Sequence, residues 1–118
     1  MLREPPLPVN SWIFCWLILR LTLARSATLT WYGPGYYGHR TADGTVYTAE
    51  HWGIAAPGYV PLGSWVRVTV GERSVIAPVT DRLGIDDPAW WDASYAVAEA
   101  LGMIDAGNVE AMIEVLVE

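Results

Sequence analysis

The chain has no lysine: its seven basic residues are all arginines, against 13 acidic residues. The formal net charge of −6 argues against a nucleic-acid binder, because such proteins need a basic face to neutralise phosphates. It also argues against a protein that is drawn to anionic membranes. The partner must therefore be recognised through shape and hydrogen bonds, which fits a neutral glycan better than an anionic polymer.

Cysteine and histidine are scarce as well. Cys15 is the one cysteine, so no disulfide can form within the chain, and no small-residue pattern of a lipidation site precedes it. The two histidines, His39 and His51, lack the spacing of zinc ligands. We therefore expect neither a metal nor another cofactor.

Length and apolar content set the scale of the fold. With 118 residues, 53% of them hydrophobic, the chain can build one compact core but not two. Residues 1–26 differ from the rest, because Arg3 precedes an apolar run over 12–24 and Ala24-Arg25-Ser26 offers small residues to a signal peptidase. We expect residues 1–26 to be a signal peptide and residues 27–118 to form one exported domain.

The exported form is expected to be a monomer without a membrane span, located in the periplasm, the cell envelope or outside the cell. An uncleaved anchor is the alternative. The apolar run is short for a membrane span, however, and Arg20 interrupts it.

Alternating apolar and polar residues predict several short strands. In the strand over 27–32, Leu29 and Trp31 should face the core and leave Thr30 and Tyr32 on the other face. Strands over 64–70 and 73–79 should form a hairpin, with Val66, Val68 and Val70 on one side of the first. Further strands are expected over 46–48, 53–56 and 109–117.

One helix is predicted near the end of the chain. Asp92 resembles an N-cap, and Gly102 follows the last residue of a helix over 93–101. The predicted apolar stripe of this helix is Ala93, Val97, Ala100, Leu101 and Ile104. The expected fold is therefore mainly β with one short helix.

Pro78-Val79-Thr80-Asp81-Arg82 is an apolar strand that ends in an acid and a base before a loop. An aspartate at a strand end that faces a cleft can be partly desolvated, which raises its pKa and lets it carry a proton near neutral pH. The alternative is a salt-bridged turn residue. Because a nearby guanidinium would lower that pKa, we expect Arg82 to point toward a sugar carbonyl or a backbone oxygen instead.

Seven tryptophans and six tyrosines are many for this length. Flat aromatic faces suit either a tight core or the apolar faces of sugar rings. Tyr32, Tyr36, Tyr37 and Trp52 could form such a stacking platform. Tyr36 and Tyr37 belong to a glycine-rich loop over 33–38 that Tyr32 precedes, and Trp52 follows a turn at Asp43-Gly44.

Several strings resemble the rare lipoprotein A (RlpA) family and occur in the family's order over nearly all of residues 27–118. They are Trp31-Tyr32-Gly33, Thr41-Ala42-Asp43-Gly44, Pro61-Leu62-Gly63 before Trp65-Val66-Arg67-Val68, Asp81-Arg82, and Asp92-Ala93-Ser94-Tyr95 through Ala100-Leu101-Gly102-Met103. The resemblance implies a six-stranded double-psi β-barrel with one short helix, as in expansins, barwin-like proteins and endoglucanases. It also implies a groove for glycan strands and, in active members, lytic transglycosylase activity on peptidoglycan.

The functional positions of the family carry over unevenly. The family's D-R-G-P aspartate matches Asp81, although Leu83-Gly84 follows where Gly-Pro is usual. The family's T-A-x-G-E glutamate falls on Thr45, and its A-A-H histidine falls on Pro57, several residues after His51. Thr45 and the residues at 53–56 look more like the related three-aspartate (3D) domains, which are also double-psi barrels of cell-wall enzymes.

A lytic transglycosylase can work with one carboxyl group, because the muramic acid's own C6 hydroxyl attacks the anomeric carbon. Asp81 is the expected acid and base, with His51 and Thr45 as hydrogen-bonding helpers. The expected substrate-binding residues on the glycan strands of peptidoglycan are Thr30, Tyr32, Gly33, Tyr37, Asp43, Trp52 and Arg82. The alternatives are a non-catalytic, expansin-like glycan-binding or wall-loosening module, and a structural envelope protein with a vestigial groove.

Overall fold

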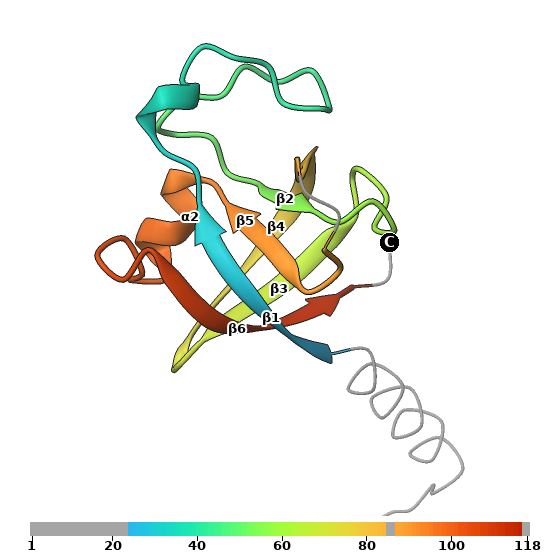
Figure 1. The fold of residues 1–118 in the computed structure, drawn as a ribbon, viewed down its shortest axis with the longest axis vertical. Coiled ribbons are helices and arrows are strands. Elements are labelled where there is room, and N and C mark those ends of the chain that lie inside the picture. The colour runs from blue at the N-terminus through green and yellow to red at the C-terminus, as the bar shows by residue number, and fades with distance from the viewer. Residues whose placement is uncertain (1–23, 85–86, 117–118) are drawn as a thin grey trace, which may run out of the picture.

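Six strands close into a barrel in the computed structural model, which describes residues 24–84 and 87–116 (Figure 1). The order around the barrel is β1-β5-β2-β4-β3-β6. The strands are β1 Ala24–Trp31, β2 Ile54–Ala56, β3 Trp65–Val70, β4 Arg73–Arg82, β5 Trp90–Ala93 and β6 Asn108–Val115. A single turn of 3₁₀ helix, η1 Pro34–Tyr36, and one short α-helix, α2 Tyr95–Ala100, complete the described elements. The predicted class, mainly β with one short helix, is confirmed.

The predicted inner faces of the long strands are confirmed. Leu29, Val66 and Val68 are fully buried, and Val70 packs against the same core. Trp31 is half-buried at the edge of this core, where its indole N–H donates to the carbonyl oxygen of Ile104 at 3.3 Å. The period-two pattern therefore fixes which side of each strand forms the barrel interior.

Strand β6 closes the barrel, because it pairs antiparallel with both β1 and β3. Its pairing with β1 begins at Ala24, opposite Glu114. Residues Ala24–Ser26, which we assigned to the end of the signal peptide, thus belong to a paired strand. The rest of the predicted signal peptide lies outside the described residues.

The region before the helix differs from the prediction. Asp92 is not an N-cap, because it lies inside β5, a strand that we did not predict. The N-cap of α2 is Ser94, whose side chain accepts from the N–H of Val97 at 3.4 Å. The helix therefore begins two residues later than expected. It buries Ala98 rather than Ala100, which is exposed.

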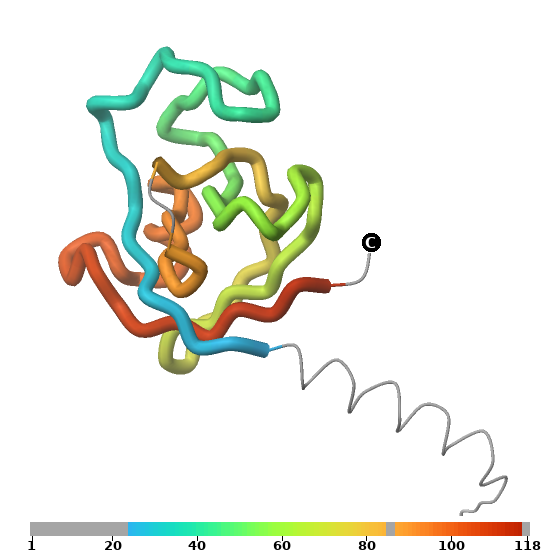
Figure 2. The backbone as a smooth tube through the Cα atoms, turned by 45° about the vertical axis from the view of Figure 1, so that its right-hand side comes forward, coloured from blue at the N-terminus to red at the C-terminus, as the bar shows by residue number. Residues whose placement is uncertain are grey.

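The strand predicted over 46–48 does not form. Val46 makes one isolated bridge with Arg40, and both belong to a long connection between β1 and β2. Figure 2 shows this connection above one end of the barrel. Tyr47, in its middle, is buried and donates its hydroxyl to the carbonyl oxygen of Tyr32 at 2.6 Å. This contact ties the connection to the end of β1.

Candidate functional site

A cleft of about 250 Å³ opens where the β1–β2 connection meets the ends of the strands. It combines two carboxylates with three tyrosines and a cationic rim. Its lining residues are Tyr32, Tyr36, His39, Arg40, Thr41, Tyr47, Ala55, Asp81, Arg82, Leu83, Gly84 and Asp92.

Strand pairing places the two carboxylates on either side of Ala55. Ala55 is the register partner of Asp81 in β4 and of Asp92 in β5, while Thr30 in β1 is the partner of Asp92. Because paired residues on neighbouring strands point to the same face, these four side chains form one row across four strands. Ala55 is buried between the carboxylates, where Tyr32 and Tyr47 pack against it.

A β-bulge sets this alignment. The β2–β4 register shifts between Ile54, which pairs with Val79, and Ala55, which pairs with Asp81. Without the extra residue Thr80 would stand opposite Ala55, and the Asp81 side chain would turn to the other face of the sheet.

The Asp81 carboxylate is held by backbone amides. Its Oδ1 atom accepts hydrogen bonds from the N–H groups of Ala42 and Arg82, both at 2.9 Å. The Arg82 guanidinium instead donates to the carbonyl oxygen of Val60, so it points to a backbone oxygen as we expected. Among the described residues Arg82 forms no ion pair with Asp81, which speaks against a salt-bridged turn residue.

Asp92 has the properties that we predicted for Asp81. Burial raises its pKa from an ordinary value of 3.8 to about 6, and the negative charge of Asp81 adds to the rise, while a hydrogen bond from Thr30 opposes it. Thr30 Oγ1 lies 2.9 Å from Asp92 Oδ1 and accepts from the indole N–H of Trp90 at 3.2 Å. Since Thr30 donates to Oδ1, the proton of neutral Asp92 belongs on Oδ2.

The aromatic side chains are not arranged as one stacking platform. Tyr32 is only 8% exposed, and its ring stacks on that of Tyr47 with centroids 4.5 Å apart. Tyr47 in turn accepts from the backbone N–H of Tyr95 at 2.9 Å. Tyr36, Tyr37 and Trp52 are exposed, at 59%, 37% and 39%, but Trp52 lies apart from the two tyrosines, with its indole N–H on the Ile76 carbonyl. A sugar ring could stack on Tyr36 or Tyr37 but not on Tyr32.

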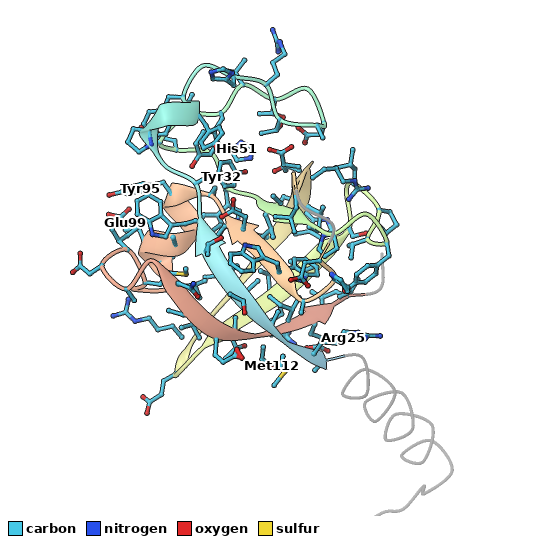
Figure 3. All side chains as sticks on the ribbon, in the orientation of Figure 1. Arg25, Tyr32, His51, Tyr95, Glu99 and Met112 are labelled. Atoms are coloured by element: carbon cyan, nitrogen blue, oxygen red, sulfur yellow. The ribbon has the colours of Figure 1, made fainter. Side chains whose placement is uncertain are left out.

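His51 supports the site from behind rather than lining it. His51 belongs to the β1–β2 connection (Figure 3) and is buried. Its Nε2 atom lies 2.9 Å from the hydroxyl of Thr80, the residue before Asp81. Burial lowers the pKa of His51, against the opposing charges of Asp43 and Asp81. Gly53 is required beside this pair, because a Cβ atom there would lie 2.3 Å from Thr80 Oγ1.

Comparison with known proteins agrees with this architecture. No family model matches the sequence. The chain is 34% identical over 93 residues to the Vibrio cholerae protein named endolytic peptidoglycan transglycosylase RlpA, and 37% identical over 90 residues to the Pseudomonas aeruginosa protein of the same name. These alignments cover 77% and 74% of this chain. This chain carries an RlpA-like domain. It spans only 35% and 26% of the length of those two relatives.

Solved structures place the RlpA-like domain among double-psi β-barrels. The Streptomyces papain inhibitor aligns with a TM-score of 0.67 and 23% identity, over 80% of this chain and 94% of the inhibitor. A Clavibacter michiganensis expansin solved with cellohexaose aligns with a TM-score of 0.66 and 17% identity, over 80% of this chain and 50% of the expansin. At these identities the likeness establishes the fold.

Several residues that we assigned to the site of the RlpA-like domain lie outside the cleft. Asp43 accepts from the Thr41 hydroxyl at 2.6 Å and from the Thr45 N–H at 3.1 Å. Burial opposes ionisation of Asp43, but these hydrogen bonds outweigh it and lower the pKa. Both Asp43 and Thr45 therefore shape the turn that presents Ala42 to Asp81.

Trp52, Gly33 and Tyr37 are also outside the cleft lining. The Trp52 indole N–H donates to the carbonyl oxygen of Ile76 at 2.9 Å, on the outer side of the barrel. A Cβ atom on Gly33 would lie 3.1 Å from the Trp31 ring, so this glycine permits close packing. Tyr37 packs beside Tyr47 with ring centroids 5.3 Å apart.

Sequence reasoning missed Asp92 as a site residue. It stands in one of the strings that resemble the RlpA family, but its position before a helix favoured a capping role.

The described residues contain no group of three or more His, Cys, Asp or Glu side chains that could hold a metal ion. The same part of the chain contains no helix that is long and apolar enough to cross a membrane.

Proposed function

We propose that this domain is an exported lytic transglycosylase that cleaves the glycan strands of peptidoglycan and leaves 1,6-anhydro-muramic acid ends. The observation that carries the proposal is the Asp81–Ala55–Asp92 row, in which two carboxyl groups with different environments face one cleft. Such pairs are the usual basis for assigning an acid and a base. The names of the RlpA relatives support the choice of substrate.

Asp92 is the better general acid of the two. With a pKa of about 6, roughly a tenth of its carboxyl groups are protonated at pH 7. General acid catalysis is efficient when the pKa of the acid lies near the working pH, as it does here. Neutral Asp92 would donate from Oδ2 to the glycosidic oxygen as the bond from that oxygen to the anomeric carbon breaks.

Asp81 is the better base. Two backbone N–H groups hold its carboxylate in place, which also stabilises the negative charge opposite a developing oxocarbenium ion. In the proposed step the C6 hydroxyl oxygen of muramic acid bonds to the anomeric carbon, and Asp81 takes the hydroxyl proton. One proton is thus given and one taken, and no water is consumed. Exchange with solvent restores both carboxyl groups.

Both carboxyl groups line one cleft of about 250 Å³, so one sugar unit could reach both. Asp81 and Asp92 are each one strand away from Ala55, so their Cα atoms are at most about 10 Å apart at the usual strand spacing. Exposed Tyr36 at the rim offers a flat face to a neighbouring sugar ring.

A glycan-binding module without catalysis is the second candidate. Thr45 and Pro57 occupy positions where the family resemblance expects a glutamate and a histidine, and neither residue can transfer a proton. An expansin of which about half shares this fold was solved in complex with cellohexaose, a neutral glycan, which supports a glycan as the ligand of such a module.

Incubation with purified peptidoglycan separates the two candidates. The wild-type domain should release fragments with anhydromuramic ends, detected by mass spectrometry. Asp81→Asn should abolish release while keeping most of the binding in a pull-down, because the amide preserves shape but cannot accept the proton. A wild-type domain that binds peptidoglycan and releases nothing between about pH 4 and 8 would establish the binding module instead.

A further inference from the structure

The hydroxyl of Tyr32 has no hydrogen-bond partner, although it is buried; among the described residues it is the one buried side-chain polar atom in this state. A buried hydroxyl without a partner is costly, and native proteins rarely leave one without a reason. Tyr32 lines the cleft, so an occupant of the cleft could supply the missing partner.

The Tyr32 ring is fixed in its position. It stacks on Tyr47, packs against Ala55 and meets Tyr36 edge-to-face with ring centroids 6.0 Å apart. The backbone carbonyl of Tyr32 is bound by the Tyr47 hydroxyl. The ring is therefore preorganised, so a ligand that reaches the buried hydroxyl need not reorder the Tyr32 side chain.

The surroundings of this hydroxyl determine what it can do. Burial raises the pKa of Tyr32 well above its ordinary value, and the negative charge of Asp81 adds to the rise. Tyr47 and Asp92 make smaller contributions. The hydroxyl therefore stays a hydrogen-bond donor. The nearby Thr80 hydroxyl opposes the rise. Its geometry does not meet that of a hydrogen bond to Tyr32, and its partner is His51 Nε2 at 2.9 Å.

We propose that the Tyr32 hydroxyl positions the substrate by donating to the oxygen of a neutral sugar hydroxyl held between Asp81 and Asp92. A sugar hydroxyl can accept from Tyr32 and at the same time donate to a carboxylate. An anionic group would be repelled by the two carboxylates, and a carbonyl oxygen has no proton to give them. The choice of a sugar as the ligand rests on the proposed function.

Tyr32→Phe tests this role, since it removes the hydroxyl and keeps the ring. The probe is a short glycan strand released from peptidoglycan and stripped of its peptides, and its affinity is measured by calorimetry. Loss of one hydrogen bond should weaken binding about fivefold to tenfold. The Tm should stay unchanged or rise, because a buried hydroxyl without a partner has been removed.

Two tyrosines provide matched controls. Tyr47→Phe removes a hydroxyl that has two partners, so its Tm should fall by several degrees. Tyr59→Phe removes a hydroxyl bonded to the Pro88 carbonyl at 3.3 Å, in a separate cleft beside Arg25 and Trp91, and should leave glycan affinity unchanged.

The outcomes separate this inference from the proposed function. Equal affinities of Tyr32→Phe and wild type would overturn the inference, even if the wild type cleaves peptidoglycan. A Tm loss in Tyr32→Phe as large as in Tyr47→Phe would overturn it too, because it would reveal a structural partner. A wild type that binds the glycan without cleaving it, with weaker binding by Tyr32→Phe, would refute the catalytic function and support the inference. A wild type that does not bind the glycan at all would contradict both.

Discussion

Replacing Asp92 by asparagine should stabilise the domain at neutral pH. The folded-state pKa of about 6 lies above the ordinary value of 3.8, so the folded state binds the proton more tightly than the unfolded chain does. The stability that protonated Asp92 contributes to the folded state is fully present below about pH 3.8 and is lost as pH rises through about 6. At 1.36 kcal/mol per tenfold change, ionised Asp92 costs about 3 kcal/mol at pH 7 and above. Asparagine avoids this cost and keeps an acceptor for Thr30.

Urea unfolding followed by tryptophan fluorescence at pH 4, 6 and 8 tests this reasoning, the range being chosen to span the ordinary and the raised carboxyl pKa. The stability gain of Asp92→Asn over wild type should be below about 1 kcal/mol at pH 4 and approach about 3 kcal/mol at pH 8. Asp105→Asn, an exposed carboxyl in the α2–β6 loop, should change the free energy of unfolding by less than about 0.5 kcal/mol at every pH. A gain for Asp92→Asn that is the same at all three pH values would refute the argument that burial of its charge opposes folding.

Two further predictions concern the framework of the site, and a third concerns processing of the chain. Gly53→Ala should destabilise the domain by roughly 1–3 kcal/mol, because its Cβ atom would lie 2.3 Å from Thr80 Oγ1 and 2.7 Å from His51 Nε2. Gly58→Ala, where the Cβ atom meets nothing within 4 Å, is the control in the same urea titration, and equal losses would contradict the steric account. Removal of residues 109–118 should abolish cooperative unfolding, because β6 pairs with both β1 and β3 and its loss leaves their backbone groups unpaired; a truncated chain that still unfolds cooperatively would indicate an open sheet. Intact-mass analysis of the exported protein should give a chain that begins at Ala27, and a species that retains Met1 with acylated Cys15 would contradict the predicted processing.

The sequence was sufficient to predict the long strands and the fold class, because their alternating residues report burial directly. It was not sufficient for β5. Trp90–Ala93 forms a strand only through its pairing with β1 and β2, which are far away in the sequence. Asp92 and Ser94 are both residue types that cap helices, so local reasoning could not choose between them.

The same limit applies to the site. Asp81 was found from its place at a strand end. Asp92 was not, because it stands opposite Ala55 only through the pairing of β2 with β5, and a bulge in the β2–β4 register is also needed to bring Asp81 into the same row. Trp52 was expected to bind substrate because it is aromatic and near His51. Its indole instead satisfies the Ile76 carbonyl, a contact that depends on how the connection folds back against β4.

The central claim is that the sugar's own hydroxyl, and not water, attacks the anomeric carbon, with Asp92 as the acid and Asp81 as the base. Digestion of purified peptidoglycan in water enriched in heavy oxygen, followed by mass spectrometry of the released fragments, tests it most directly. If the sugar hydroxyl attacks, the wild type forms anhydromuramic ends that carry no heavy oxygen, and neither Asp81→Asn nor Asp92→Asn forms them. Reducing muramic acid ends that carry heavy oxygen would show hydrolysis and contradict the account.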